Sequence, residues 1–347
     1  MDVRLASNEV LLVADRGAQR QHGLWLWHNH EGHWQGRQVD TVDQLSCLTG
    51  HPHLPTVYGA SGVGQVGMLH AWHVDTQGEY VLSAAGSGGG EPCHVAVDPS
   101  GRLLVATNYT TSTISLQRLD PDGAFEGKPV LIRLSGSGPD RERQEDAHPH
   151  QVIFDGEVLV VVDLGADLVR EFRIDLSGAE VAAEEIRRTQ MPAGSGPRHA
   201  VLLPDRRMAV SGELGENLIT GHRGQPVDEW TDVRSTRVMD PGRARWPRNY
   251  PGDIQRSVDG RYVYLANRSH NTVATFDMAE ASPALVAELD TTVDWPQHIL
   301  VRPDCMLIAG WDSSRVVVAP LLNGIPQTAI PLFDCEAPGW LYAHRCS

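Results

Sequence analysis

The sequence predicts an all-β fold, a seven-bladed β-propeller whose blades are four-stranded antiparallel sheets. A short β-rich run recurs seven times along the chain, and a separate strand precedes most of the copies. No segment longer than about ten residues shows a helical period. The 347 residues give each of the seven copies about 50 residues, which is the length of a four-stranded propeller blade.

The recurring run is the second strand of each predicted blade. A short polar turn and another strand follow each copy. Residues 116–120 and 170–175 in these following strands alternate with the period of two that half-buried strands show. The seven copies are residues 9–17, 56–62, 102–109, 157–165, 206–215, 261–269 and 305–313.

The first strand of most blades opens with a Pro-x-His-like element. Successive elements lie 41 to 56 residues apart, in step with the recurring run. In the sixth blade the element reads Pro251-Gly252-Asp253-Ile254. The other copies are His51-Pro52-His53, Pro92-Cys93-His94, Pro149-His150, Pro197-Arg198-His199 and Pro296-Gln297-His298.

The first copy has no leading strand of this kind, and the C-terminus supplies one. Pro338 follows Pro296 by 42 residues, in step with the series, so we expect residues 336–347 to form the innermost strand of blade one. Pairing the two ends of the chain closes the ring and leaves no open sheet edge. Residues 1–347 then make one domain. The alternative is two β domains of three to four blades each, for which the sequence offers no linker.

Composition narrows the classes of partner. Lys plus Arg number 29 against 44 Asp plus Glu, a net charge of −15, so we expect no nucleic-acid partner and no membrane partner. The longest apolar runs, such as residues 158–162, are strand-length and far short of the roughly 18 residues of a membrane helix. The N-terminus lacks a signal-peptide pattern and the five cysteines form no C-x-x-C pair, so we expect a cytoplasmic protein without disulfides or zinc.

In a propeller the innermost strands line a central channel, and the loops at one end build the site. Two histidines, His148 and His150, end a long polar loop that begins at Gly138 and leads into blade four. Two residues apart on a strand, they face the same side, and histidine exchanges protons near neutral pH. The alternative for both is a structural role at the start of a strand.

Two arginines follow in neighbouring blades. Arg198 lies at the start of blade five, and Arg268 follows the second strand of blade six. Each can bind a carboxylate or phosphate in bidentate fashion, or serve only in a structural salt bridge or on the surface. Other copies place different residues at the position of Arg198, namely Cys93, Pro149 and Gln297.

Glu213 ends the second strand of blade five. Side chains at this position usually cap the following turn, but Glu makes such turns poorly. Near Arg198, a carboxylate is therefore expected to act as a general base on water. We align this position in other blades with Asn108, Asp163, Asn267 and, less regularly, Asp312.

The 16 histidines also invite a metal-site interpretation. The Pro-x-His histidines occupy equivalent positions around a wide ring, so we expect neighbours to lie too far apart to share one ion at bonds of about 2 Å. No Gly-rich phosphate loop, nucleophile elbow or dinucleotide fingerprint appears in the sequence. We therefore expect neither a metal nor an organic cofactor.

These motifs resemble those of the lactonase family of seven-bladed propellers. That family includes the cycloisomerase-2 type of 6-phosphogluconolactonase and the fungal 3-carboxy-cis,cis-muconate cyclase. The similarity runs from about residue 8 to 345. The segments that carry it are residues 88–109, 138–152, 163–167, 194–205, 211–219 and 259–276.

The resemblance implies a site of one His, one Glu and two Arg at the channel mouth, and hydrolysis of a sugar lactone, foremost 6-phosphogluconolactone to 6-phosphogluconate. The two arginines hold the anionic substrate, the glutamate is the general base, and the histidine protonates the leaving oxygen. The matching residues are His148, Arg198, Glu213 and Arg268. We further expect substrate contacts from His150, His199, Asn108 and Tyr109.

The sequence departs from the family at the mouth. Thr110 to Ser112 stand where glycines are usual, Gln297 replaces an Arg, and Trp311 stands where a small polar residue is common. Two alternatives therefore stay open: a cycloisomerase acting on an unsaturated diacid through the same site, and a non-catalytic interaction scaffold. We expect a small anionic lactone or carboxylate as the partner, and a monomer or weak homo-oligomer.

Overall fold

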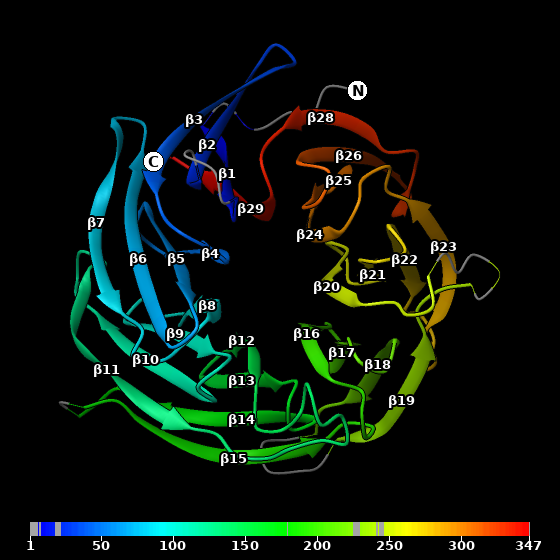
Figure 1. Ribbon diagram of the computed structural model, residues 1–347, viewed down its shortest axis with the longest axis horizontal. Helices are drawn as coiled ribbons and strands as arrows, with labels where there is room; N and C mark the ends of the chain where they lie inside the picture. Colours follow the sequence, from blue (N-terminus) through cyan, green and yellow to red (C-terminus); the bar gives the residue numbers. More distant parts are fainter. Residues whose placement is uncertain are drawn as a thin grey trace.

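A computed structural model describes the chain at residues 6, 8–17, 22–178, 180–224, 230–240, 242 and 246–346. Over these residues the chain contains β-strands and turns but no α-helix. The described strands form seven sheets that stand around a central axis like the blades of a propeller (Figure 1). Residues 1–5, on which part of the signal-peptide argument rests, and residue 347 of the predicted closing strand lie outside the described residues.

Within each blade the strands run outward from the axis (Figure 1). Blade one comprises β29 (Pro338–Arg345), β1 (Glu9–Asp15), β2 (Gly23–His30) and β3 (His33–Thr41). Blade two comprises β4 (Cys47–Gly50), β5 (Thr56–Val63), β6 (Val66–Asp75) and β7 (Gly78–Gly86). Blade three comprises β8 (Pro92–Val97), β9 (Leu103–Asn108), β10 (Thr113–Leu119) and β11 (Phe125–Arg133). Blade four comprises β12 (Pro149–Asp155), β13 (Val158–Asp163), β14 (Leu168–Asp175) and β15 (Ala182–Gln190). Blade five comprises β16 (Pro197–Leu202), β17 (Arg207–Gly212), β18 (Asn217–His222) and β19 (Thr231–Arg237).

Blades six and seven complete the ring. The seventh has its outer edge split between the two-residue β27 and β28, both of which pair with β26. Blade six comprises β20 (Pro251–Arg256), β21 (Tyr262–Asn267), β22 (Thr272–Asp277) and β23 (Ala284–Asp290). Blade seven comprises β24 (Pro296–Val301), β25 (Cys305–Gly310), β26 (Arg315–Leu322), β27 (Ile325–Pro326) and β28 (Ile330–Asp334).

The ring closes where the sequence predicts. β29 pairs antiparallel with β1 along its whole length, from Glu9 opposite Arg345 to Asp15 opposite Pro338. This confirms the predicted seven-bladed propeller and its closing C-terminal strand. Closure ties the two ends of the chain together, so neither end leaves an unpaired inner strand.

The apolar core lies between the blades. Alternate residues of a central strand face opposite neighbours, because side chains of a strand alternate between its two faces. In β9, Leu103 and Val105 pack against blade four, whereas Leu104 and Ala106 pack against blade two. Both faces are buried, and this is why the recurring second strands are almost continuously apolar.

Blade two differs from the prediction. Its innermost strand β4 begins at Cys47 and has no proline at its start. The predicted element His51-Pro52-His53 follows β4 and lies in the turn to β5, at the opposite end of the blade. There the ring nitrogen Nδ1 of His51 accepts hydrogen bonds from the N–H groups of His53 and Leu54. The Pro-x-His match in this blade is therefore a turn, and the sequence-based assignment was wrong.

The chain shows no helix with the length and apolar character needed to cross a membrane, as far as its described residues go.

Candidate functional site

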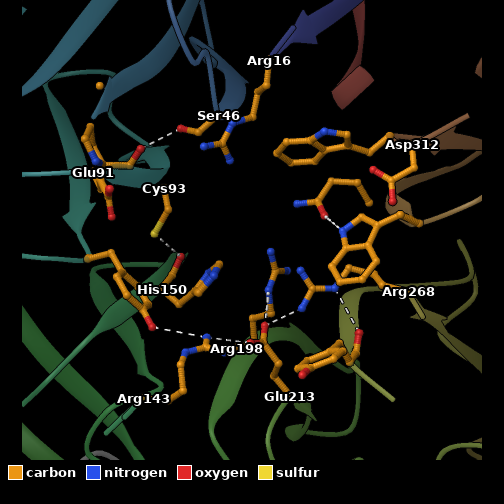
Figure 2. Close-up of a pocket in the computed structure, with 17 residues that line it drawn as sticks. Arg16, Ser46, Glu91, Cys93, Arg143, His150, Arg198, Glu213, Arg268 and Asp312 are labelled. Carbon is orange, nitrogen blue, oxygen red and sulfur yellow. Dashed lines mark hydrogen bonds and ion pairs between the residues drawn. The ribbon is translucent and has the colours of Figure 1, made fainter. Parts of the chain in front are cut away.

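One mouth of the central channel opens into a cavity of about 820 Å³. Figure 2 shows its side chains converging from several blades, with Arg16 on one side and Glu213, Arg198 and Arg143 on the other. A cavity of this size is in the range of small-molecule sites.

The residue that follows the second strand of a blade is brought to this mouth by a repeated hydrogen bond. Its N–H donates to the carbonyl oxygen just before the innermost strand, at 2.9 to 3.3 Å. The donor residue lines the cavity in every case below except Leu164. The pairs are Arg16 with Ala337, Tyr109 with Glu91, Leu164 with His148, Glu213 with Gly196, Arg268 with Tyr250, and Trp311 with Trp295.

This repeat corrects the sequence alignment of Glu213 by one residue. Glu213 is equivalent to Arg268 and Tyr109, not to Asn108, Asp163 and Asn267, which lie one position earlier. Those earlier side chains face the turns: Asp163 Oδ1, for example, accepts the N–H groups of His148 and Ala166. The turn-capping interpretation fits them, and the cavity-facing position is the next one.

A β-bulge brings a second set of side chains to the mouth. Pro149 pairs with Asp163 and Gln151 with Val162, which leaves His150 outside the ladder. Bulges of this kind re-aim the extra residue. Equivalent bulges follow Pro92, Pro197 and Pro296. The residues after these prolines all line the cavity: Cys93, His150, Arg198 and Gln297.

The counterpart of Arg198 in blade four is therefore His150 and not Pro149, as the sequence alignment had it. In blade six the same position holds Gly252. A Cβ there would lie 2.9 Å from Cδ and Nε of Arg268, so the glycine leaves the space that the Arg268 side chain occupies.

Glu213 is the centre of the charged side of the cavity. Its Oε1 accepts a hydrogen bond from Arg143 Nη2 at 2.8 Å, and its Oε2 accepts one from Arg268 Nη2 at 2.6 Å. Arg198 Nε lies 3.0 Å from the same Oε2 as an ion pair, without the alignment of a hydrogen bond. Side chains from blades five and six and from the loop into blade four thus converge on one carboxylate.

Burial alone would raise the pKa of Glu213, but the charges of Arg268 and Arg198 outweigh it and hold that pKa well below its usual range. Burial and the charge of Arg268 lower the pKa of Arg198 to about 10, which leaves its guanidinium protonated at neutral pH. Glu213 is therefore ionised at neutral pH, and it is a weak base as long as all three arginines hold it.

A buried chain of contacts holds Arg198 from below. Its Nη1 donates to Nε2 of His199 at 3.3 Å, and Nδ1 of His199 donates to Asp253 Oδ1 at 3.1 Å. Because Nε2 accepts, the proton of a neutral His199 is on Nδ1, facing Asp253. Asp253 and His199 therefore orient Arg198, and His199 does not line the cavity.

Of the eight residues predicted for the site, five line the cavity: Tyr109, His150, Arg198, Glu213 and Arg268. His148 is not among the lining residues. Its ring stacks on Tyr109 with centroids 4.4 Å apart, and its Nδ1 lies 2.9 Å from the carbonyl oxygen of Tyr109. Asn108 is also buried away from the cavity, where its Nδ2 donates to Thr113 and Ser115.

His150 takes the place predicted for His148. It is partly buried, and its Nδ1 has no hydrogen-bond partner among the described residues. Burial and the charge of Arg198 hold the pKa of His150 well below its usual range. The imidazole is neutral at pH 7 and able to accept or pass on a proton within the cavity.

The histidines of the innermost strands meet at the axis beneath the cavity. Ring centroids of His94 and His199 lie 5.7 Å apart, and those of His150 and His199 lie 5.1 Å apart. Trp340 from the closing strand packs among them, 4.0 Å from His298. The ring is therefore narrower at its centre than the sequence led us to expect. Within the described part of the chain, no group of three or more His, Cys, Asp or Glu is placed to hold a metal ion.

Comparison with known proteins agrees with this architecture. The sequence profile of the family described as "Lactonase, 7-bladed beta-propeller" matches residues 28–321. The chain belongs to this lactonase family. It is 28% identical over 225 residues to a 6-phosphogluconolactonase of Bacillus subtilis, covering 62% of this chain and 61% of that protein. It is 24% identical over 337 residues to a 6-phosphogluconolactonase of Formosa agariphila, covering 88% and 91%.

Solved structures of similar shape cover almost the whole propeller. A protein of Lactobacillus plantarum matches with a TM-score of 0.86 at 22% identity, covering 96% of this chain and 99% of the other. The periplasmic gluconolactonase of Pseudomonas aeruginosa matches with a TM-score of 0.83 at 21% identity, covering 98% and 99%. At these identities the likeness establishes the fold, and a cytoplasmic location of this lactonase-family chain stays a prediction.

Two cavity arginines of this lactonase-family chain escaped the sequence analysis. Arg143 is one of several charged residues in the loop 138–150, and nothing in that loop marks which of them turns inward. Arg16 is the next-to-last residue of the first recurring run, 9–17, as Arg268 is of its own copy, 261–269. Aligning the copies one residue later would have found Arg16, because the repeat places Glu213, Arg268 and Arg16 at equivalent positions.

Proposed function

We propose that this protein hydrolyses a lactone of a sugar acid that carries an anionic group, foremost 6-phosphogluconolactone to 6-phosphogluconate. The observation that carries the proposal is the cluster of Arg143, Arg198 and Arg268 on Glu213 inside one cavity. Relatives named 6-phosphogluconolactonase support the choice of substrate class.

The charge of the cavity suits an anionic substrate. Three guanidinium groups surround Glu213, and the next carboxylate beneath them is Asp253, which is engaged by His199. The cluster therefore keeps a positive excess. Arg268 uses two of its N–H groups, on Tyr250 and Glu213, which leaves others for the substrate.

The reaction needs one water and two proton transfers. The water oxygen bonds to the lactone carbonyl carbon while Glu213 takes a water proton, and Arg198 and Arg268 stabilise the negative charge that develops on the carbonyl oxygen. The acyl C–O bond to the ring oxygen then breaks, and that oxygen receives the proton from Glu213. The products are one carboxylic acid and one hydroxyl group, so atoms and charge balance.

Substrate binding would adjust Glu213 to this task. An anionic substrate that draws one or two arginines away from Glu213 removes part of the positive charge that depresses its pKa. Glu213 then becomes a stronger base, while its acid form stays strong enough to protonate the departing ring oxygen. His150 lines the same cavity with its Nδ1 unpartnered, which supports a role in hydrogen-bonding the water or the leaving oxygen. The sequence analysis expected His148 to protonate that oxygen, and the mechanism proposed here gives this step to Glu213.

Cys93 also lines the cavity but suits a nucleophilic role poorly. Burial raises the pKa of its thiol to about 11, so it is protonated at neutral pH. A protonated thiol is not a nucleophile. Direct attack by water therefore fits the cavity better than a thioester intermediate.

A screen of lactones tests the proposal. Phosphorylated and free aldonolactones, together with muconates, are incubated with the wild-type protein and with Arg198→Ala, and rates are compared with the uncatalysed background. We expect turnover of δ-lactones by the wild-type protein and a loss of at least about tenfold in Arg198→Ala. Turnover of muconates alone would favour the cycloisomerase alternative, and no turnover of any of them would favour the scaffold.

A further inference from the structure

Arg16 stands in blade one where Glu213 and Arg268 stand in blades five and six. Its N–H donates to the carbonyl oxygen of Ala337 at 3.2 Å, immediately before the closing strand β29. The same bond positions Glu213 and Arg268. Closure of the ring by the C-terminal strand therefore fixes the backbone position of Arg16. Figure 2 shows the Arg16 side chain pointing into the cavity.

Two side chains fix the direction of the Arg16 guanidinium. Its Cζ lies 4.9 Å from the centroid of the Trp311 ring, in a cation–π contact. Its Nε donates to Gln44 Oε1 at 3.3 Å. A guanidinium stacked on an aromatic ring keeps its edge N–H groups in one plane, which is the arrangement that binds an oxyanion in bidentate fashion.

Within the part of the chain that the structure describes, no ion pair neutralises the charge of Arg16. Among the residues that the structure describes, no carboxylate lies within ion-pair distance of it, in contrast to Arg143, Arg198 and Arg268. Glu91 is the carboxylate that acts on its charge, and one oxygen of Glu91 accepts the N–H of Gly64. Asp312 also lines the cavity, but its side chain is exposed to solvent.

Arg16 faces the Glu213 cluster across the cavity (Figure 2). A ligand whose reacting carbon lies at Glu213 therefore presents its far end to Arg16. Trp311 and Ser46 flank this end of the same cavity.

We propose that Arg16, held over Trp311, is a second anion subsite that binds the terminal oxyanion of the substrate, a phosphate monoester or a carboxylate, at the end opposite the lactone carbonyl. This inference rests on the proposed lactonase function. Under this proposal the two sides of the cavity have different roles. The reaction takes place at the Glu213 side, and the Arg16 side selects lactones that carry an anionic group at the far end.

The test compares lactones that differ only in the tail. The ratio of kcat/KM for 6-phosphoglucono-δ-lactone to that for glucono-δ-lactone is measured for the wild-type protein and for Arg16→Gln. We expect the ratio to fall about 10- to 100-fold in Arg16→Gln, mainly through KM, because a charge-assisted contact to phosphate is lost. Arg16→Lys should recover part of the loss, since it restores charge without the planar fork.

A matched control and a third substrate sharpen the result. Arg173→Gln removes an exposed arginine on β14, paired with Glu184, and should leave the ratio unchanged. A glucarolactone, which ends in a carboxylate, distinguishes the two kinds of oxyanion. If its kcat/KM depends on Arg16 to a similar degree, the subsite recognises negative charge in general. If its kcat/KM does not depend on Arg16, the subsite is specific for phosphate.

The outcomes separate the two proposals. If the wild-type protein hydrolyses δ-lactones and the ratio is unchanged in a folded Arg16→Gln, the subsite is wrong and the lactonase function stands. If no lactone is hydrolysed, the proposed function is wrong, and calorimetric titration with inorganic phosphate then tests Arg16 alone. A titration identical in the wild-type protein and Arg16→Gln would overturn the subsite as well.

Discussion

Two arginines stack on tryptophans at the mouth of this propeller, and they differ in their partners. Arg268 lies 5.1 Å from the Trp295 ring and Arg16 lies 4.9 Å from the Trp311 ring. Both follow the second strand of their blades and are positioned by the same backbone bond. Arg268 donates to Glu213, however, whereas Arg16 donates to the neutral amide of Gln44.

The difference shows how one repeat position can hold an arginine in two different electrostatic settings. An arginine bound to a carboxylate is rigid and sets the basicity of that carboxylate. An arginine held only by an aromatic ring and an amide keeps its charge for a ligand. Sequence position and stacking are the same in both cases, so under the proposals above the partner from the neighbouring segment decides between a role in the chemistry and a role in recognition.

The largest expected effect lies on the Glu213 side. Glu213→Gln keeps the shape of the side chain but removes the proton acceptor, so kcat for δ-lactones should fall by about 10²- to 10⁴-fold. Glu184→Gln, the same change at an exposed position on β15, should have no effect. Steady-state rates of the two variants side by side decide the matter, and equal rates would remove Glu213 from the chemistry.

Acid should unfold the protein through the histidines beneath the Glu213 side. Burial lowers the pKa of His94 to about 3, and burial with the charge of Arg198 lowers that of His199. Below about pH 6.5 these histidines are protonated in the unfolded chain but stay neutral in the folded chain. The free energy of unfolding therefore falls as the pH drops below that value. Each histidine contributes up to about 1.4 kcal/mol per pH unit.

Denaturant unfolding between pH 7 and 5 measures this slope, above the range in which most carboxylates titrate. His94→Asn should make the slope shallower. Arg16→Gln should not, because Arg16 is not among the charges that act on these histidines. If the slope were unchanged in His94→Asn but changed in Arg16→Gln, the Glu213 side and the Arg16 side of the cavity would not be electrostatically separate.

Gly252→Ala should disturb Arg268 without changing its chemistry. The added Cβ would lie 2.9 Å from Arg268 Cδ, so the Arg268 side chain must shift from the position in which it meets Glu213. We expect kcat to fall about tenfold, since small displacements of a positioned group are costly. Gly86→Ala is the matched control because a Cβ there meets nothing within 4 Å. Equal rates for both variants would mean that the position of Arg268 is unimportant.

Gly339→Ala should produce the smallest effect, on the Arg16 side. Its Cβ would lie 3.2 Å from Arg16 Cδ, a tight contact that the flexible side chain can relieve in part. We expect about a threefold rise in KM for the phosphorylated lactone with kcat preserved. A change in kcat instead would show that Arg16 acts in the chemistry as well as in binding.

The recurring strands made most of the fold predictable, because a central strand buried on both faces must be apolar and must repeat in every blade. Glu213 and Arg268 were found for a related reason, as charged residues at the ends of those strands, and Arg198 as a charged residue at the start of an innermost strand. His150 and Arg16 were not assigned their present positions for two reasons. A bulge after Pro149 shifts the facing residue by one, and the sequence alignment matched Glu213 with the residue before its true counterpart in other blades, so Arg16 was not recognised.

The order of apolar and turn residues along the chain by itself determined the seven blades, their closure by the C-terminal strand and the mouth at which the charged residues gather. Only the tertiary structure decided which of two adjacent side chains faces the cavity and which arginines share a carboxylate. The physical reason is that blade formation depends on local periodicity, whereas ion pairing between neighbouring blades and loops depends on distances that no local pattern encodes.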